Sequence, residues 1–382
     1  MEEWKEYKLG DISTMKYGKL PPSSTGKLYP IWSGYRYVGM ADTSNCSKGT
    51  MVVVARGVGG TGDVKVAKED CYLTNLSIAV DLTPNVCNPY YLYYKYLIRN
   101  LKYLDSGSAQ SQITIDALKN LLIELPPLDY QNRIVSVFKS LDDKIEVNKR
   151  INENLEQQAQ ALFKSWFVDF EPFKDGEFVE SELGMIPKGW RVESLSSIAD
   201  YINGLAMQKY RPEEVEKGLP VLKIKELGQG SVDENSELCS PSLIGEKYII
   251  NDGDIIFSWS GTLMVKVWCG GKCGLNQHLF VVVPKDYQKW FVYQWTKYHL
   301  YNFIRIAKDK AVTMGHIKRG ELDKAKVIIP DSDNLTRIDA LMDPIFNQII
   351  SNEIESRRLA TLRDALLPKL MSGELKVNEI KE

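Results

Sequence analysis

Two long stretches of the chain repeat their core positions in alternating steps of four and three residues. The first begins at Ile134 and continues with Phe138, Leu141, Ile145, Asn148, Asn152, Leu155, Ala159, Leu162 and Trp166. The second consists of Ile338, Met342, Ile345, Ile349, Asn352, Ser356, Leu359, Arg363, Leu366 and Leu370. Such heptad seams are typical of coiled-coil helices. Each helix should span about 55 Å at 1.5 Å per residue and serve as a spacer.

The segments before each long helix have shorter and mixed patterns. Runs rich in β-branched residues predict strands at 51–55, 64–67, 76–80, 221–225, 254–259 and 278–283. Helical spacing predicts helices near 89–101, 115–120, 288–304 and 318–322. Each half of the chain is therefore expected to be a mixed α and β block followed by one long helix.

The two halves are copies of each other. At an offset of 204 the second half aligns with the first without a gap from about Ser106 onward, and WKEYKLGDI (4–12) matches WRVESLSSI (190–198) at a shorter offset. Duplicated helices can pack antiparallel about a pseudo-two-fold axis, which would bring Asn148 near Asn352. A buried polar pair there would fix the helix register. The alternative is that both asparagines face solvent.

Composition and charge are those of an ordinary globular protein. The net charge of −2 gives no sign of a nucleic-acid partner, but residues 1–128 carry 14 Lys+Arg against 12 Asp+Glu, and residues 181–330 carry 20 against 17. The two blocks are thus mildly basic and the long helices acidic. No apolar window is long enough for a membrane span and the N-terminus has no signal-peptide pattern, so a cytoplasmic location is expected.

The stretch MVVVARGVGGTGD contains Gly57, Gly59 and Gly62 in the spacing of a dinucleotide-binding loop, with Asp81 about where a ribose-binding carboxylate would lie. Such a loop requires a following helix to receive the pyrophosphate. The residues that follow alternate instead, and the second copy retains only Gly261. A hairpin tip is therefore the simpler interpretation.

Other candidate chemistry is weak. NPYY at residues 88–91 lacks the second proline of an amino-methyltransferase motif and is well explained as the start of an aromatic-rich helix. Cys269, Cys273 and His278 approach metal-ligand spacing, but a fourth zinc ligand is hard to find, and buried thiols are the favoured interpretation. No catalytic arrangement stands out, so we expect neither catalysis nor a metal site.

Three segments closely resemble the specificity subunit of type I restriction–modification systems. They are SELGMIPKGWRVESL (181–195), the run from LPPLDYQNRIVSVF to KSWFVDF (125–170), and LRDALLPKLMSGEL (362–375). The resemblance covers essentially the whole chain, and the combination of a duplicated block, a helix that follows PP and the ELGxIPKGW linker is specific.

The resemblance implies an α+β protein with two similar target recognition domains separated by two long antiparallel coiled-coil helices. Each domain would read half of a bipartite site in double-stranded DNA, and the chain itself would lack catalytic activity and cofactors. Two modification subunits would carry S-adenosylmethionine, and restriction subunits would add ATP-driven, Mg-dependent cleavage. The expected division is 1–128 and 190–333 for the recognition domains, 129–172 and 334–373 for the helices, 173–189 for a linker and 374–382 for a tail.

Candidate DNA contacts are cations beside amides and aromatics on loops. In the first block they are Lys16, Tyr17, Lys19, Trp32, Tyr35, Arg36, Arg56, Gly57, Gly59, Ser108, Gln110 and Gln112. In the second block they are Asn203, Gln208, Lys209, Lys223, Lys225, Trp259, Ser260, Asn276, Gln277, Lys310, Thr313 and His316. For each residue, plain surface exposure is the alternative; Lys223 and Lys225 could be outward-facing strand residues, and Trp32 and Trp259 could be core.

Contacts to modification subunits are expected on the outer helix faces and on Phe163, Trp166, Phe167 and Phe170. Packing of these aromatics against the core of their own block is the alternative. Two other functions remain open, which are a stand-alone S-adenosylmethionine-dependent methyltransferase that uses the glycine loop and a coiled-coil scaffold whose blocks bind protein.

Overall fold

The computed structural model describes residues 4–22, 26–57, 60–107, 111–309 and 316–377. These residues divide into two compact units. The first unit comprises the chain up to Asp143 together with the segment from Leu359 onward, and the second comprises Lys144–Arg358.

The first unit is built around a four-stranded antiparallel sheet with the order β2-β8-β5-β6. A smaller sheet has the order β4-β3-β7, and β1 pairs with β9. The elements before the long helix are β1 (Lys5–Lys8), η1 (Leu9–Ile12), β2 (Ser13–Tyr17), β3 (Tyr29–Ser33), β4 (Arg36–Ala41), β5 (Met51–Val54), β6 (Val64–Val66), β7 (Tyr72–Leu73), β8 (Ser77–Leu82), α1 (Pro89–Lys95), η2 (Leu101–Leu104), α2 (Ile115–Lys119) and β9 (Leu122–Leu125).

The second unit repeats this topology. Its sheets have the orders β13-β20-β17-β18 and β15-β14-β19-β16, and β12 pairs with β21 as β1 pairs with β9. Its elements between the long helices are η3 (Glu171–Phe173), β10 (Phe178–Ser181), β11 (Gly184–Pro187), β12 (Arg191–Ser194), α4 (Leu195–Ile198), β13 (Ala199–Asn203), η4 (Met207–Lys209), β14 (Leu219–Leu222), α5 (Ile224–Gln229), β15 (Leu238–Cys239), η5 (Glu246–Tyr248), β16 (Ile249–Ile250), β17 (Ile255–Ser258), β18 (Met264–Val267), β19 (Cys273–Leu275), β20 (Leu279–Pro284), α6 (Lys289–Asp309), α7 (Gly320–Lys324) and β21 (Lys326–Ile329).

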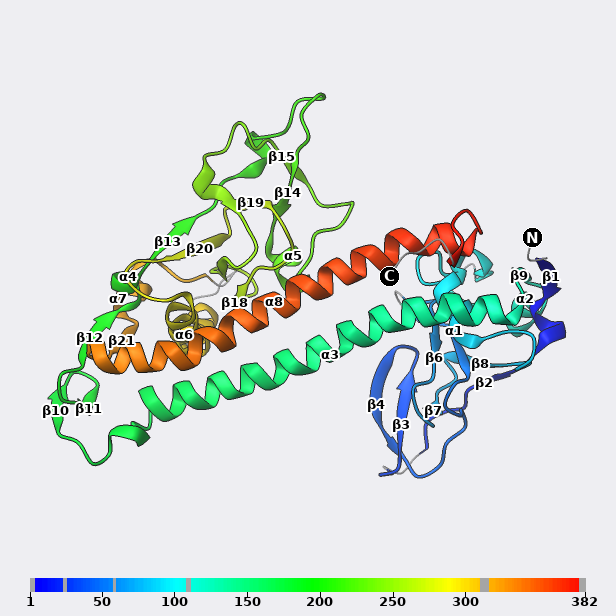
Figure 1. Ribbon diagram of the computed structural model, residues 1–382, viewed down its shortest axis with the longest axis horizontal. Helices are drawn as coiled ribbons and strands as arrows, with labels where there is room; N and C mark the ends of the chain where they lie inside the picture. The colour runs from blue at the N-terminus through cyan, green and yellow to red at the C-terminus, as the bar shows by residue number, and fades with distance from the viewer. Residues whose placement is uncertain (1–3, 23–25, 58–59, 108–110, 310–315, 378–382) are drawn as a thin grey trace. The chain divides into compact units, whose positions relative to one another are not determined.

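Two helices of 40 residues each, α3 (Leu128–Phe167) and α8 (Ser332–Met371), follow the two blocks (Figure 1). In the second unit the two helices run antiparallel, because Asn148 contacts Ser356 while Asn152 contacts Asn352. The first unit contains the pair Asp142 and Arg363 at 2.6 Å, and the second contains Asn152 and Asn352. The first long helix was predicted to end at residue 172, and α3 ends five residues earlier, at Phe167. The predicted linker, 173–189, contains the β10–β11 hairpin.

A ladder of buried asparagines joins the two helices in the second unit. Asn352 Nδ2 donates to Asn152 Oδ1 at 2.8 Å, and Asn148 Nδ2 donates to Ser356 Oγ at 3.2 Å. These two contacts are equivalent under the 204-residue repeat. Asn148 and Asn352 do lie close together, since Asn148 Nδ2 also donates to the Asn352 carbonyl at 3.4 Å. Both side chains are buried, so the alternative that they face solvent is wrong.

Each unit has its own apolar core, formed by one sheet, its helices and part of both long helices. In the first unit Ile134, Phe138, Leu367 and Leu370 complete the core. In the second unit Phe163, Phe167, Ile338, Met342 and Phe346 do so, and α6 lies along α8 (Figure 1). Both heptad seams are therefore apolar at their ends because the blocks pack there.

Most predicted strands and helices are present, with two differences. The predicted helix 89–101 ends at Lys95, and a separate 3-10 turn follows at Leu101–Leu104. The predicted strand 221–225 ends at Leu222, because Lys223 begins the helix α5. Asn88 caps α1 by accepting from Tyr90 N, with Pro89 in the first turn, as the interpretation of NPYY required.

Candidate nucleic-acid interface

The glycine-rich stretch is a β-hairpin tip. β5 and β6 pair antiparallel on either side of it, so among the described residues a strand follows this stretch and not the helix that a pyrophosphate site needs. Gly62 lies at φ 95°, and a Cβ there would meet the backbone nitrogen of Lys102 at 2.4 Å. This glycine is therefore required for close packing against η2, while Gly57 at φ 135° faces open space and Gly59 lies outside the described residues.

Three predicted residues of the first unit meet beside this tip. Arg56 follows β5 and forms an isolated backbone bridge with Gln112. Its guanidinium lies 6.0 Å from the ring centroid of Tyr17, at the end of β2. The Tyr17 hydroxyl accepts a hydrogen bond from Ile115 N at 3.2 Å, which fixes the ring. The sequence-predicted candidates Ser108 and Gln110 lie outside the described residues.

A second group combines cations with exposed aromatic rings. Arg36 and Lys65 lie over the ring of Tyr35, at 5.6 and 5.5 Å from its centroid. Trp32 makes an edge contact with Tyr37 at 6.0 Å. Lys65 was not among the predicted contacts. Its position on the strand after the glycine tip was the available signal, since outward-facing cations on a hairpin are natural phosphate contacts.

The remaining predicted cations of the first unit, Lys16 and Lys19, differ in whether a carboxylate pairs with them. Lys16 Nζ lies 3.8 Å from the Asp81 carboxylate, which also accepts from the Thr50 hydroxyl at 2.8 Å. Asp81 is thus paired with side chains of its own unit, which argues against a role as a ribose-binding carboxylate. Lys19 forms a backbone bridge with Thr74 and has an exposed side chain.

In the second unit a cluster forms around Trp259 at the end of β17. Its indole Nε1 donates to Asn203 Oδ1 at 2.9 Å, and its ring centroid lies 6.3 Å from the rings of both His278 and His316. Ser260 Oγ lies 3.1 Å from His278 Nδ1, and Ser260 forms a backbone bridge with His316. The structure thus brings together four predicted residues and one, His278, that was considered only as a metal ligand.

The turn between β19 and β20 supplies the edge of this cluster. Gln277 Nε2 lies 3.3 Å from His278 Nε2. Asn276 is 4% exposed and accepts from His278 N, so its side chain shapes the turn and is not free to contact a base, contrary to the prediction. Ser260 is also buried, at 6% exposed, which corrects the prediction that it is a direct contact.

The other predicted cations of the second unit are partly neutralised. Lys223 Nζ lies 2.6 Å from Glu237, and Lys225 Nζ lies 3.1 Å from Asp233. Neither is an outward-facing strand residue, because they lie at the start of α5. Gln208 and Lys209 are exposed on η4, while Lys310 and Thr313 lie outside the described residues.

Neither a metal cluster nor a membrane helix occurs in the described part of the chain. There, no group of three or more His, Cys, Asp or Glu could hold a metal ion, and no helix is long and apolar enough to cross a membrane. Burial raises the pKa of Cys269 to about 12 and that of Cys273 to about 12, which favours the neutral thiols.

Comparison with known proteins decides the family. A family model described as type I restriction modification DNA specificity domain matches residues 1–157 and 187–362, so it occurs once in each half of the chain. The chain belongs to this family.

Specificity subunits of several organisms are similar to it. The MjaIX specificity subunit of Methanocaldococcus jannaschii is 29% identical over 418 aligned positions that cover 99% of this chain and 95% of the relative. The HindI specificity subunit of Haemophilus influenzae is 26% identical, with 69% of this chain and 71% of the relative covered. The crystal structure of an S subunit from M. genitalium has the same fold, with a TM-score of 0.65 at 16% identity and 96% coverage of both chains.

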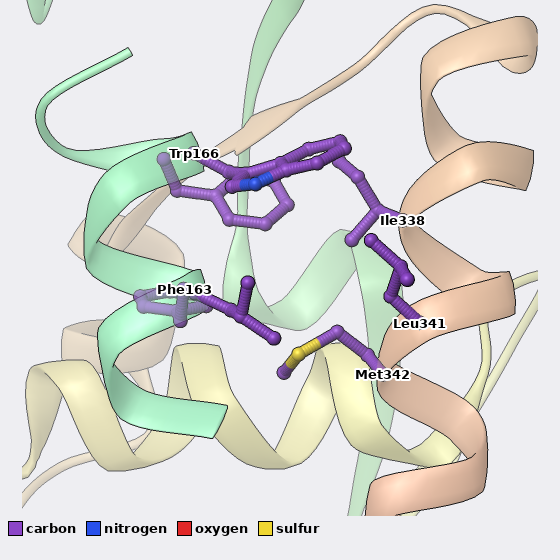
Figure 2. A pocket seen from close by; sticks show the side chains of 7 residues that line it. Phe163, Trp166, Ile338, Leu341 and Met342 are labelled. Atoms are coloured by element: carbon purple, nitrogen blue, oxygen red, sulfur yellow. The ribbon is translucent and has the colours of Figure 1, made fainter. Parts of the chain in front are cut away.

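In this specificity subunit the predicted partner aromatics have separate roles. Phe163 and Phe167 are 6% and 2% exposed and pack edge-on against Trp295, so they belong to the core of the second unit and not to a docking surface. Phe170 packs edge-on against Trp190. Trp166 and Phe170 are both half-buried, and Figure 2 shows Trp166 extending from α3 toward Ile338 of α8.

Trp166 borders a shallow apolar hollow on the helix pair. Phe163 and Trp166 from α3 lie on one side of it, with Ile338, Leu341 and Met342 from α8 on the other (Figure 2). Leu341 is 50% exposed and contributes the rim.

Proposed function

We propose that this chain reads a bipartite target in double-stranded DNA, with one half-site recognised by each block. The observation that carries the proposal is that one loop arrangement occurs in both blocks, with different side chains at its equivalent positions. The bridge between Arg56 and Gln112 in the first block corresponds to the bridge between Ser260 and His316 in the second. Equivalent loops that present different side chains are what two unlike half-sites would require.

The chemistry of the two clusters supports DNA as the ligand. The first combines arginine and lysine with tyrosine rings, and the second combines tryptophan, histidine and glutamine. Cations suit phosphates, while amides, imidazoles and guanidinium groups suit base edges. With a net charge of −2 for the chain, partner subunits would contribute much of the attraction to DNA.

We further propose that the chain has no catalytic role and docks two modification subunits, one on the outer face of each long helix. Those subunits would bind S-adenosylmethionine and methylate adenine, and restriction subunits would bring ATP and Mg. The hairpin geometry of the glycine stretch disfavours the alternative of a stand-alone methyltransferase. The hollow bordered by Trp166 and Leu341 fits one protein contact, since its walls are apolar and its rim is exposed.

The test is to assemble the chain with its modification subunits and to map N6-methyladenine on a DNA library. We expect one motif of two short half-sites at a fixed gap, which disappears when this chain is omitted. An uninterrupted motif, or the same motif without the chain, would contradict the proposal. Equilibrium dialysis of S-adenosylmethionine against the isolated chain should show no binding, and tight binding would favour the methyltransferase alternative.

A salt titration separates DNA recognition from the scaffold alternative. For the assembled complex, the logarithm of the DNA association constant should fall steeply and linearly with the logarithm of salt concentration, because phosphate contacts release counterions. A complex that forms fully but binds DNA with no such slope would favour a protein scaffold.

A further inference from the structure

Arg56 and Ser260 occupy the same place in the two copies of the fold. Each lies just beyond the central strand of its sheet, β5 or β17, and each forms a backbone bridge to the loop that precedes α2 or α7. The backbone is thus held alike in both copies, and the two positions differ only in the side chain that they present.

The side chain of Arg56 has an incomplete set of partners. Its Nε is buried and has no hydrogen-bond partner among the described residues. No carboxylate of the described chain forms an ion pair with it, whereas Lys16, Lys223 and Lys225 each have one. A buried donor without an acceptor is unfavourable. The residue as a whole is only half-buried, so part of it is open to a ligand.

Tyr17 holds the guanidinium in place. The ring lies 6.0 Å from the guanidinium carbon, and its own hydroxyl is anchored by Ile115 N. Stacking on an aromatic face leaves the edge of the guanidinium plane free, and this edge carries the paired N–H donors. A planar fork of donors matches two neighbouring acceptors, and in the DNA major groove guanine presents such a pair in O6 and N7.

We infer that Arg56 reads a guanine in the half-site of the first recognition domain, with Tyr17 as its positioning residue. The inference rests on the proposed function and adds the base identity at one position. The second domain cannot use the same contact, because Ser260 is short, buried and engaged with His278. The two half-sites therefore differ at the base pair that these equivalent positions face.

The inference can be tested in the assembled methyltransferase complex by methylation mapping with two variants of Arg56. Arg56→Ser places the side chain of the second domain on a backbone that already accepts it. Arg56→Gln removes the guanidinium fork and leaves an amide, which suits adenine rather than guanine. In both variants the preference for guanine at one position of the first half-site should fall by about 5- to 150-fold, the range for loss of one bidentate base contact. The second half-site and the gap should not change.

Two further variants separate base reading from charge. Arg305→Ser on α6 makes the same charge change in the second unit and should leave both half-site sequences as they are. Arg36→Ser removes an exposed cation stacked on Tyr35, and should weaken binding to all sequences alike and reduce the salt slope by about one.

Each outcome decides the inference. A first half-site without a G·C pair overturns it, as does an unchanged guanine preference in Arg56→Gln. If Arg56→Ser fails to assemble, the glutamine variant alone decides. If the wild-type complex shows no bipartite motif, the proposed function is wrong, and this result differs from a bipartite motif that ignores Arg56.

Discussion

At the scale of single residues, the asparagine ladder sets polar atoms where a coiled coil normally buries apolar ones. Asn152 and Asn352 are 6% and 5% exposed, and their side-chain amides bond to each other. Removing Asn352 leaves the buried Asn152 Oδ1 without its donor, although Asn152 Nδ2 still donates to Glu353. Removing both asparagines makes this part of the seam apolar, so that the register depends on Asn148 alone.

We therefore expect Asn352→Leu to lower the free energy of unfolding by about 1–3 kcal/mol. The double variant Asn152→Leu with Asn352→Leu should recover most of this loss, since matched apolar residues replace the pair. Asn154→Leu, at an exposed position of the same helix, is the control and should change stability by less than about 0.5 kcal/mol. Urea unfolding measures the stability of all three variants. A double variant less stable than Asn352→Leu would contradict the argument.

Arg357 ties α8 to a turn of the second block. It pairs with both oxygens of Asp252, at 2.8 and 2.7 Å, and also donates to the Cys269 carbonyl. Burial raises the pKa of Asp252, but the hydrogen bonds from Arg357 and Gly271 outweigh it, and the pKa lies below its ordinary value. A carboxylate with a depressed pKa stabilises the fold above the pKa of the unfolded chain, about 3.9, and this contribution is lost as pH falls toward the folded pKa.

Arg357→Gln should accordingly destabilise the second unit by about 1–3 kcal/mol at pH 7. The difference from wild type should shrink as pH falls below about 4, because Asp252 then becomes neutral. Intrinsic tryptophan fluorescence during urea unfolding is a suitable measurement, since six of the eight tryptophans lie between Trp166 and Trp295. Arg358→Gln, the exposed neighbour, is the control, and a pH-independent loss would show that packing rather than charge is responsible.

At the scale of elements, the long helices have the most specific sequence pattern. Their heptads span some ten positions each, so their pairing and ends were predicted within a few residues. The short strands β3 and β4 and the helix α5 were not predicted, because five or six residues carry too little periodicity and their stability comes from tertiary contacts. For the same reason Lys223 and Lys225 were placed on a strand.

The spacer role of α3 is testable by changing its length. Insertion of four residues next to Asn148 adds about 6 Å of helix, which should widen the gap between half-sites by one or two base pairs at about 3.4 Å per pair. Both half-site sequences should remain unchanged in methylation maps. Four residues inserted after Val215, which is 97% exposed in a surface loop, serve as the control and should leave the gap as it is. Altered half-sites in the helix variant would contradict the spacer model.

At the scale of the whole molecule, duplication was readable from sequence and the interface was not. The repeat of one topology follows from the 204-residue offset, and the family model matches both halves. The loop residues that come together could not be predicted, because their contacts depend on side-chain partners that hydrophobic periodicity and motifs do not indicate. Asn203, Trp259 and His316 converge as expected, whereas Asn276 turned inward and Phe163 and Phe167 filled the core.

Independence of the two blocks gives a prediction at this scale. Replacing residues 1–125 by the matching block of a related specificity subunit should change one half-site of the methylated motif and leave the other half-site and the gap unchanged. The exchange boundary falls between β9 and α3, and the related block must be one that packs on Ile134, Phe138, Leu367 and Leu370, which complete the core of the first unit. Methylation mapping provides the measurement, and simultaneous change of both half-sites would show that the blocks read DNA jointly.

The bridges that hold Arg56 and Ser260 are made by backbone atoms, so they are indifferent to the residue that occupies the position. A mutation there can alter what the protein prefers without disturbing how it folds. If the chain reads DNA as proposed, its target could therefore change by one base at a time, and only changes to the surrounding strands would lower the stability of the fold.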